Sequence, residues 1–245
     1  MTTGAIVLSL RGATKRFGGL VAVNDMDFDV TEHEVLGLIG PNGSGKSTTL
    51  NLISGALKPT EGTISLRGTP ISHLSAADIA RRGIARTFQL VRLLPSMTVL
   101  ENVRAGAVFG HRRRWGAEAD AHALRMLALV GLDRRANAHV GELTYIDTKR
   151  VELARVLASE PKVLLLDEWL AGLNPTELEE GIALIKRLRD EGRTIILVEH
   201  VMDAIRSLCD RCVVMSTGTK IAEGTPEEVL SDPEVIRAYL GDDDA

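Results

Sequence analysis

A glycine-rich segment, GPNGSGKST, occupies residues 40–48 and follows the apolar run VLGLIG. Its spacing is Gly-x-x-x-x-Gly-Lys-Ser, in which glycines let backbone N–H groups turn inward around phosphate oxygens. Lys46 is then placed for the β- and γ-phosphates, and the Ser47 hydroxyl for Mg²⁺. Because apolar residues at helical spacing come next, we expect a strand, a phosphate-binding loop and a helix whose N-terminus favours anions.

Two adjacent carboxylates, Asp167 and Glu168, end the apolar run VLLLDE. At the tip of a buried strand, Asp167 would hold Mg²⁺, directly or through water, and Glu168 would polarise the attacking water as a general base. Adjacent carboxylates also occur at strand ends without a catalytic role. With the phosphate loop upstream, the pair indicates a nucleotide site that activates water.

The remaining apolar patterns indicate how these residues are positioned. Four short continuous runs are typical of strands buried on both faces of a parallel sheet. These runs are VLGLIG, KVLLLDE, TIILVEH and CVVMSTG. Three other segments alternate apolar and polar residues, which predicts an antiparallel β layer. They are AIVLSLRGATKRF, LVAVNDMDFDV and GTISLRGTPI. The fold class expected from these patterns is α/β.

Between the strands, three segments carry helical spacing: AADIARRGI, MTVLENVRAGAVFG and EADAHALRMLALVGL. The expected organisation is therefore one domain with a helical insert at about residues 90–159. The core would comprise residues from about 1–89 and 160–225, with a C-terminal tail at about 226–245. The acidic end GDDDA is expected to be disordered.

The composition of the 245 residues, 44% hydrophobic and 25% charged, is that of one globular domain with a sizeable core. A formal net charge of −4 offers no basic field for a phosphate backbone, so nucleic acid is not an expected partner. No apolar run approaches the roughly 18 residues that span a bilayer. We therefore expect no transmembrane segment, although docking on a membrane protein stays open.

The two cysteines, Cys209 and Cys212, form a C-x-x-C pair. Two thiols alone cannot make a four-cysteine zinc site. A redox pair and a pair of core cysteines both remain possible, and the core is favoured because Cys212 opens a strand-like apolar run.

Over almost its whole length the sequence resembles the ATP-binding subunits of ABC transporters. The motifs follow in order as RFGG, GPNGSGKST, RTFQL, LTYID, VLLLDE, AGLN and LVEH. The resemblance implies a P-loop NTPase fold with a RecA-like core and an inserted helical subdomain, with ATP and Mg²⁺ bound. The ATP-binding residues it implies are Phe17, Gly40, Pro41, Asn42, Gly43, Ser44, Gly45, Lys46, Ser47 and Thr48.

The same resemblance implies individual roles. Phe17 should stack on adenine, and Gln89 should touch Mg²⁺ and the lytic water while sensing a transmembrane partner. His200 should hydrogen-bond the γ-phosphate, and Asn174 lies in the D-loop. The implied metal ligands are Ser47, Gln89 and Asp167, and the implied catalytic residues are Glu168, His200 and Gln89. Without the resemblance, Phe17, Gln89 and His200 could be structural or surface residues.

The segment Thr144, Tyr145, Ile146 and Asp147 stands where the family usually has Ser-Gly-Gly-Gln, at the start of a helix that covers the γ-phosphate held by another subunit. Thr144-x-x-Asp147 predicts a capping box. The branched Ile146 could obstruct phosphate and the Asp147 charge could repel it. Either the backbone N–H groups still bind phosphate, or this half-site is catalytically poor.

Other stretches resemble the ATPases of branched-chain amino-acid importers: RFGGLVAVNDMDFDV, GLNPTE, LVEHVMD and GTPEEVLSDPEVIRAYLG. The implied assembly is two ATPase subunits, identical or sister chains, with two permease subunits and a substrate-binding protein, at the cytoplasmic face of the inner membrane. Leu93, Leu94 and Met97 are candidate permease contacts or core residues of the insert. The alternatives are a urea or lipopolysaccharide transporter, or a weak regulatory partner in a hetero-dimer.

Overall fold

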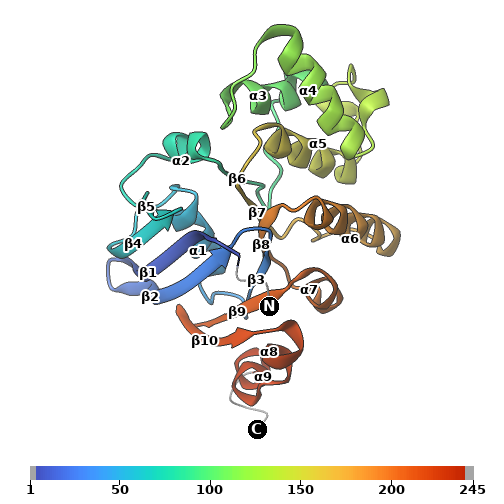
Figure 1. Cartoon of the computed structure of the whole chain (residues 1–245). Coiled ribbons are helices and arrows are strands. Elements are labelled where there is room, and N and C mark those ends of the chain that lie inside the picture. The colour runs from blue at the N-terminus through green and yellow to red at the C-terminus, as the bar shows by residue number, and fades with distance from the viewer. Residues whose placement is uncertain (1–3, 241–245) are drawn as a thin grey trace.

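The computed structural model describes residues 4–240 and is built around a six-stranded sheet (Figure 1). The strand order is β10-β9-β3-β8-β7-β6, with β10 antiparallel to β9 and the other neighbours parallel. The strands are β3 (Val35–Ile39), β6 (Ile84–Arg86), β7 (Val163–Asp167), β8 (Thr194–Val198), β9 (Arg211–Ser216) and β10 (Thr219–Gly224). The four predicted parallel strands are confirmed; β6 and β10 were not predicted.

The predicted antiparallel layer is a second sheet of order β2-β1-β4-β5. Its strands are β1 (Ile6–Phe17), β2 (Leu20–Thr31), β4 (Glu61–Leu66) and β5 (Thr69–Pro70). The layer packs against α1 (Lys46–Ile53), the helix that follows β3 (Figure 1).

Three helices form a group at one end of the molecule, above β6 and β7 in Figure 1: α3 (Val99–Phe109), α4 (Gly116–Leu129) and α5 (Tyr145–Ala158). The short helices η1 (Asp133–Arg135) and η2 (Val140–Glu142) connect α4 to α5. The other helices are α2 (Ala76–Arg82), α6 (Pro175–Asp190), α7 (Met202–Leu208), α8 (Pro226–Ser231) and α9 (Pro233–Leu240). Across residues 4–240, no helix combines the length and apolar character needed to cross a bilayer. The acidic end GDDDA lies outside the described residues.

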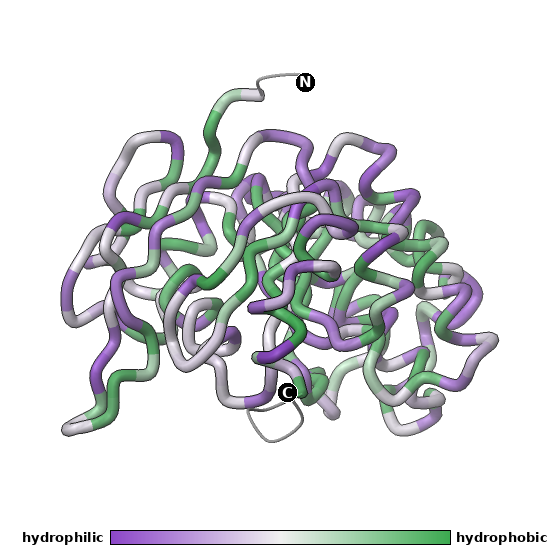
Figure 2. The backbone as a smooth tube through the Cα atoms, turned by 90° about the horizontal axis from the view of Figure 1, so that it is seen from below, coloured by the Kyte–Doolittle hydropathy of each residue, from purple (hydrophilic) through white to green (hydrophobic). Residues whose placement is uncertain are grey.

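The parallel sheet is covered on both faces because its strands alternate their side chains between two cores. On β7, Leu164 and Leu166 pack with the insert and α6, whereas Val163 and Leu165 pack with α1 and the antiparallel layer. Figure 2 accordingly shows hydrophobic segments concentrated in the middle of the molecule, with hydrophilic turns around them. In a sheet covered on both faces, functional groups can be exposed only at the ends of the strands.

The strand order decides which loops meet at the carboxyl edge of this sheet. The phosphate loop follows β3, His200 follows β8, Glu168 follows β7 and Gln89 follows β6. Because these four strands are parallel neighbours in that order, the four loops lie side by side. The fold therefore brings together residues that are far apart in the sequence.

Both cysteine thiols are buried beside Gly37 of β3. A hydrogen bond with Cys212 and burial together raise the pKa of Cys209, which keeps it a protonated, unreactive thiol. Of the two interpretations of the C-x-x-C pair, the structure favours core packing.

Gly37→Ala tests this packing. A Cβ at position 37 would lie 2.9 Å from the sulfurs of Cys209 and Cys212, so we expect overpacking to lower the free energy of unfolding by about 1–3 kcal/mol. Urea unfolding measures it, with Gly19→Ala as control because a Cβ there meets nothing within 4 Å. Equal stability of the two variants would contradict the packing.

Candidate nucleotide-binding site

The phosphate loop, residues 40–45, joins β3 to α1 and is held by close backbone contacts. Gly40 has φ +146°, and a Cβ there would lie 2.1 Å from the Met215 carbonyl oxygen. Gly45 has φ +102°, and its Cβ would lie 2.5 Å from the Ala22 oxygen. Only glycine fits either position. The loop is thereby fixed against β9 and β2 with the N-terminus of α1 at its end.

Two polar groups in this loop fit a phosphate ligand. Ser44 Oγ is buried and has no hydrogen-bond partner within residues 4–240. Lys46 Nζ, on a side chain that is 5% exposed, donates to the carbonyl oxygens of Gly40 at 2.8 Å and Pro41 at 2.9 Å. Burial lowers the pKa of Lys46, and the nearby Glu168 and Asp167 oppose that shift. A phosphate would give both groups an anionic acceptor, so the donor set suits a nucleotide.

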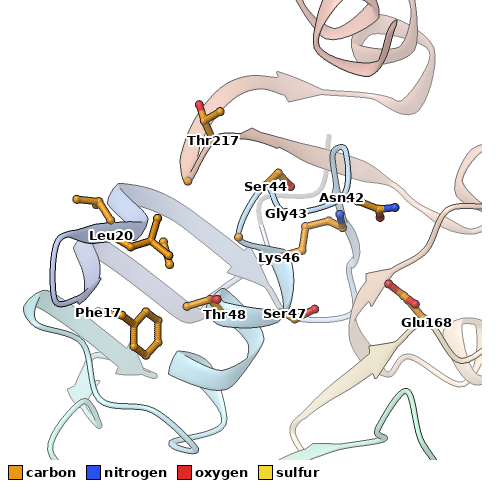
Figure 3. A pocket seen from close by; sticks show the side chains of 14 residues that line it. Phe17, Leu20, Asn42, Gly43, Ser44, Lys46, Ser47, Thr48, Glu168 and Thr217 are labelled. Atoms are coloured by element: carbon orange, nitrogen blue, oxygen red, sulfur yellow. The ribbon is translucent and has the colours of Figure 1, made fainter. Parts of the chain in front are cut away.

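The loop borders a cavity of about 540 Å³ (Figure 3). Phe17 and Leu20 lie at one end and Glu168 at the other, with the loop between them. Phe17 is 46% exposed and lines the cavity, with the Lys15 ammonium 5.2 Å from its ring centroid. The cavity is lined by the predicted residues Phe17, Asn42, Gly43, Ser44, Gly45, Lys46, Ser47, Thr48 and Glu168, and by five that were not predicted: Leu20, Val21, Ala22, Thr217 and Gly218. Gly40 and Pro41 act behind the lining, through Lys46.

Thr217 and Gly218 reach the cavity through the turn between β9 and β10. The Gly218 N–H donates to the backbone carbonyl oxygen of Ser44 at 3.0 Å, and the Asn24 N–H donates to the carbonyl oxygen of Gly218 at 2.8 Å. The sequence signal for this contact was only a Thr-Gly turn after an apolar run. Strand pairing across the molecule decides where such a turn points.

Glu168 is held between two of the predicted catalytic residues. Gln89 Nε2 donates to its Oε2 at 2.5 Å, and His200 Nε2 lies 2.9 Å from its Oε1. Glu168 has φ +49°, a left-handed conformation that is uncommon for a residue with a side chain. The three side chains come from the ends of β6, β7 and β8, and they form a cluster beside the phosphate loop.

Asp167 has a partner that the sequence did not reveal. Arg86, the last residue of β6, donates to Asp167 Oδ2 at 2.6 Å and to Asn51 Oδ1 at 2.6 Å. The side chains of Arg86 and Asp167 are 7% and 6% exposed. Asp167 therefore belongs to a buried ion pair, which orients its carboxylate at the strand end.

The segment 144–147 lies at the start of α5 and is not part of the cavity lining. Thr144 caps the helix by accepting from the Asp147 N–H at 3.3 Å. The predicted capping box is half correct, because no described bond runs from the Asp147 carboxylate back to Thr144; that carboxylate lies 3.9 Å from Arg150 Nη1. Ile146 is 7% exposed, so its side chain turns into the protein. It does not obstruct the helix end in the way the sequence analysis considered. Thr144 and Tyr145 are the exposed residues of the segment, Tyr145 at 52%.

Asn174 caps α6: its side-chain oxygen accepts from the Glu177 N–H at 3.0 Å, and the Glu177 carboxylate accepts from the Asn174 N–H at 3.0 Å. In this chain its contacts are those of a helix cap.

A protein-family model described as ABC transporter matches residues 23–171, which is more than half of the chain. The chain belongs to the ABC transporter family. ATP hydrolysis coupled to transport is therefore its activity. A second model, described as branched-chain amino acid ATP-binding cassette transporter, matches residues 219–245.

Similar proteins in this family cover nearly the whole chain. The high-affinity branched-chain amino acid transport ATP-binding protein LivG of Salmonella typhimurium is 43% identical over 96% of this chain and 98% of its own length. BraF of Pseudomonas aeruginosa is 42% identical over the same shares. The ADP conformation of MJ1267, an ATP-binding cassette of an ABC transporter, superposes with a TM-score of 0.88 at 32% identity, covering 97% of this chain and 99% of that one. These matches confirm the predicted α/β P-loop NTPase fold.

Glu199 is a buried carboxylate of this ABC cassette that the sequence did not single out. It is 1% exposed, precedes His200, and accepts from the Leu170 N–H at 2.7 Å. Burial raises its pKa from 4.5 to about 7, against hydrogen bonds from the Leu170 and His200 backbone. Glu199 therefore changes charge near neutral pH, next to the catalytic cluster.

Arg86→Met should destabilise the cassette by about 3–5 kcal/mol, because it leaves the Asp167 carboxylate buried without its cation. The control is Arg11→Met, whose pair with Asp29 has side chains 54% and 33% exposed and should lose about 0–1 kcal/mol. Urea unfolding of both variants measures the difference. Comparable losses would contradict the role of burial.

Glu199→Gln tests the raised pKa. The folded chain holds this proton more tightly than the unfolded chain, because the folded pKa of about 7 exceeds the ordinary 4.5. The associated stability is fully present below about pH 4.5 and is lost as pH rises through about 7. The neutral glutamine escapes this loss, so the variant should gain up to about 3 kcal/mol on wild type between roughly pH 5 and 8. A pH-independent difference in unfolding free energy would refute the assignment.

Proposed function

We propose that this chain is the ATP-hydrolysing subunit of an importer for branched-chain amino acids. The observation that carries the proposal is Glu168 at the end of a phosphate-loop cavity, hydrogen-bonded to both Gln89 and His200. The solute is supported by the 43% identity with LivG and by the C-terminal match at residues 219–245.

In the proposed reaction Glu168 accepts the proton of the attacking water, and Gln89 and His200 orient its carboxylate and the terminal phosphate. Lys46 and the loop amides hold the β- and γ-phosphates, and Phe17 covers the adenine. The oxygens of Ser47, Asp167 and Gln89 suit Mg²⁺, a hard cation that prefers oxygen ligands. When bound, Mg²⁺ neutralises charge that develops on the phosphate oxygens.

Two such subunits would enclose ATP head to tail, with the Thr144 end of α5 covering the γ-phosphate held by the other subunit. The Asp147 N–H is bonded to the Thr144 hydroxyl, but the Tyr145 and Ile146 amides at this helix end are not blocked, because the Ile146 side chain is buried and the Asp147 carboxylate lies beside Arg150. These contacts support a working half-site over a catalytically poor one. A solved dimer of the cassette MJ0796 bound to ADP and Pi, 30% identical over 89% of this chain with a TM-score of 0.81, supports the pairing.

Two permease subunits would hold the pair at the cytoplasmic face of the inner membrane, and a substrate-binding protein would deliver the solute to them. An apolar cavity of about 350 Å³ between α2, β6, α3 and α5 suits a short helix from a permease loop, and Phe88 and Phe109 line it. Phe109 is 71% exposed, and Met97 lines an adjoining cavity with it. Leu93 packs against the core, so of the three candidate contacts Leu94 and Met97 remain.

Glu168→Gln should reduce ATP turnover by about 10²–10⁴-fold, because the general base is lost while the shape of the side chain is kept. Phosphate release by the purified transporter measures the rate, and the chain with Mg²⁺ and ATP should now accumulate as a dimer around trapped nucleotide. The control is Glu227→Gln, which changes an exposed glutamate of α8 and should leave turnover unchanged.

Uptake of labelled leucine, isoleucine and valine tests the solute in cells that lack this chain. Wild type should restore uptake and Glu168→Gln should not. Wild-type turnover in Glu168→Gln would refute the proposed chemistry. The proposed solute would be refuted if wild type restored uptake of urea alone. It would also be refuted if wild type restored no uptake of any solute while still hydrolysing ATP.

A further inference from the structure

Helix α5 carries two fully buried charges one turn apart, Lys149 at 1% and Glu152 at 0% exposure. Burying a charge is costly unless hydrogen bonds compensate it. Here the compensation comes largely from backbone groups of two other segments, the loop that holds Gln89 and the segment that follows Glu168.

Glu152 holds the Gln89 loop from both sides. One carboxylate oxygen accepts from the Phe88 N–H at 3.3 Å and the other from the Arg92 N–H at 3.0 Å. The Phe88 ring is also contacted by the guanidinium groups of Arg86, 5.4 Å from its centroid, and Arg92, 4.4 Å away. Gln89 thus lies in a short loop whose two ends bond to the same carboxylate.

Lys149 holds the segment after the catalytic base in the same way. Its ammonium donates to the carbonyl oxygens of Trp169 and Ala171, both at 2.9 Å, and of Glu168 at 3.4 Å. The buried Trp169 ring returns a bond of 3.2 Å from Nε1 to the Lys149 oxygen. Three carbonyls that converge on one cation hold the chain directly after the left-handed Glu168.

We propose that Lys149 and Glu152 are positioning residues of ATP hydrolysis, which attach Glu168 and Gln89 of each subunit to the helix that begins at Thr144. The inference rests on the proposed function, in which Thr144 covers the nucleotide of the other subunit. A shift of α5 on contact with that nucleotide moves the base and the glutamine of its own subunit together. Each site thereby controls the catalytic groups of the other.

Lys149→Met and Glu152→Met test the positioning in the assembled transporter. Both should lower kcat on the order of tenfold or more while KM for ATP and binding of a non-hydrolysable ATP analogue change less than about threefold, because the phosphate loop is untouched. Lys149→Arg and Glu152→Gln keep part of the hydrogen bonding and should recover part of kcat. If the methionine variants fail to fold, the kcat values of Lys149→Arg and Glu152→Gln test the positioning role instead.

Two control positions lie elsewhere in the chain, a buried carboxylate and a partly exposed cation, each bonded to the backbone. Glu34 is a buried carboxylate, 8% exposed, that accepts from the Thr31 N–H at 2.8 Å away from the site. Arg189 on α6 donates to the Ser207 carbonyl oxygen at 3.3 Å. Glu34→Gln and Arg189→Met should leave kcat within about twofold of wild type, which separates positioning from a general loss of packing.

A double-mutant cycle tests the coupling between sites. Thr144→Ala should lower kcat in the wild-type background and lower it by a much smaller factor with Glu152→Gln, since both changes interrupt one connection. Multiplicative effects would overturn the coupling, and wild-type kcat in all four Lys149 and Glu152 variants would overturn the positioning. Either result leaves the proposed function intact as long as Glu168→Gln is inactive.

Discussion

Negative charge at the end of a strand that is buried on both faces is the constraint on which this site depends. Asp167 is buried and Glu168 follows it directly, so both carboxylates need partners drawn from other parts of the chain. Arg86 pairs with Asp167, and Gln89 and His200 bond to Glu168. Each partner follows or ends a neighbouring parallel strand. The sheet that buries the carboxylates therefore also brings the groups that orient them.

The phosphate loop places positive potential opposite these carboxylates. It combines the N-terminus of α1, the ammonium of Lys46 and the buried hydroxyl of Ser44. Its close contacts with Met215 and Ala22 keep it from collapsing into the space a nucleotide needs. Lys46 donates to carbonyl oxygens of the loop and also interacts electrostatically with Asp167 and Glu168. A nucleotide with its cation would thus enter between two sets of charges that the fold already holds apart.

Helix α5 connects the two segments that carry Gln89 and Glu168. Its first residues lie outside the cavity, but one and two turns further on it bonds to both catalytic segments through Lys149 and Glu152. The partners are backbone amides and carbonyls, so the helix sets the course of the segments and leaves the side chains of Gln89 and Glu168 free to react. Glu199, next to His200 and near Lys149, adds a group whose charge varies close to neutral pH.

The sequence by itself determined the phosphate loop, the Asp167–Glu168 pair, the apolar strands and the family, because contiguous spacing and local periodicity specify a turn, a strand or a helix start. It did not determine the partners of those groups. Arg86, Lys149, Glu152, Glu199 and the Thr217–Gly218 turn carry no local signal of their function, and a sequence pattern could not tell that Ile146 turns inward or that Asp147 lies beside Arg150 instead of closing a capping box. Those facts depend on burial and on the strand order β3-β8-β7-β6, which places residues 40, 200, 168 and 89 side by side. Only tertiary structure decides that order, since it is set by how helices and sheets bury their apolar faces against one another.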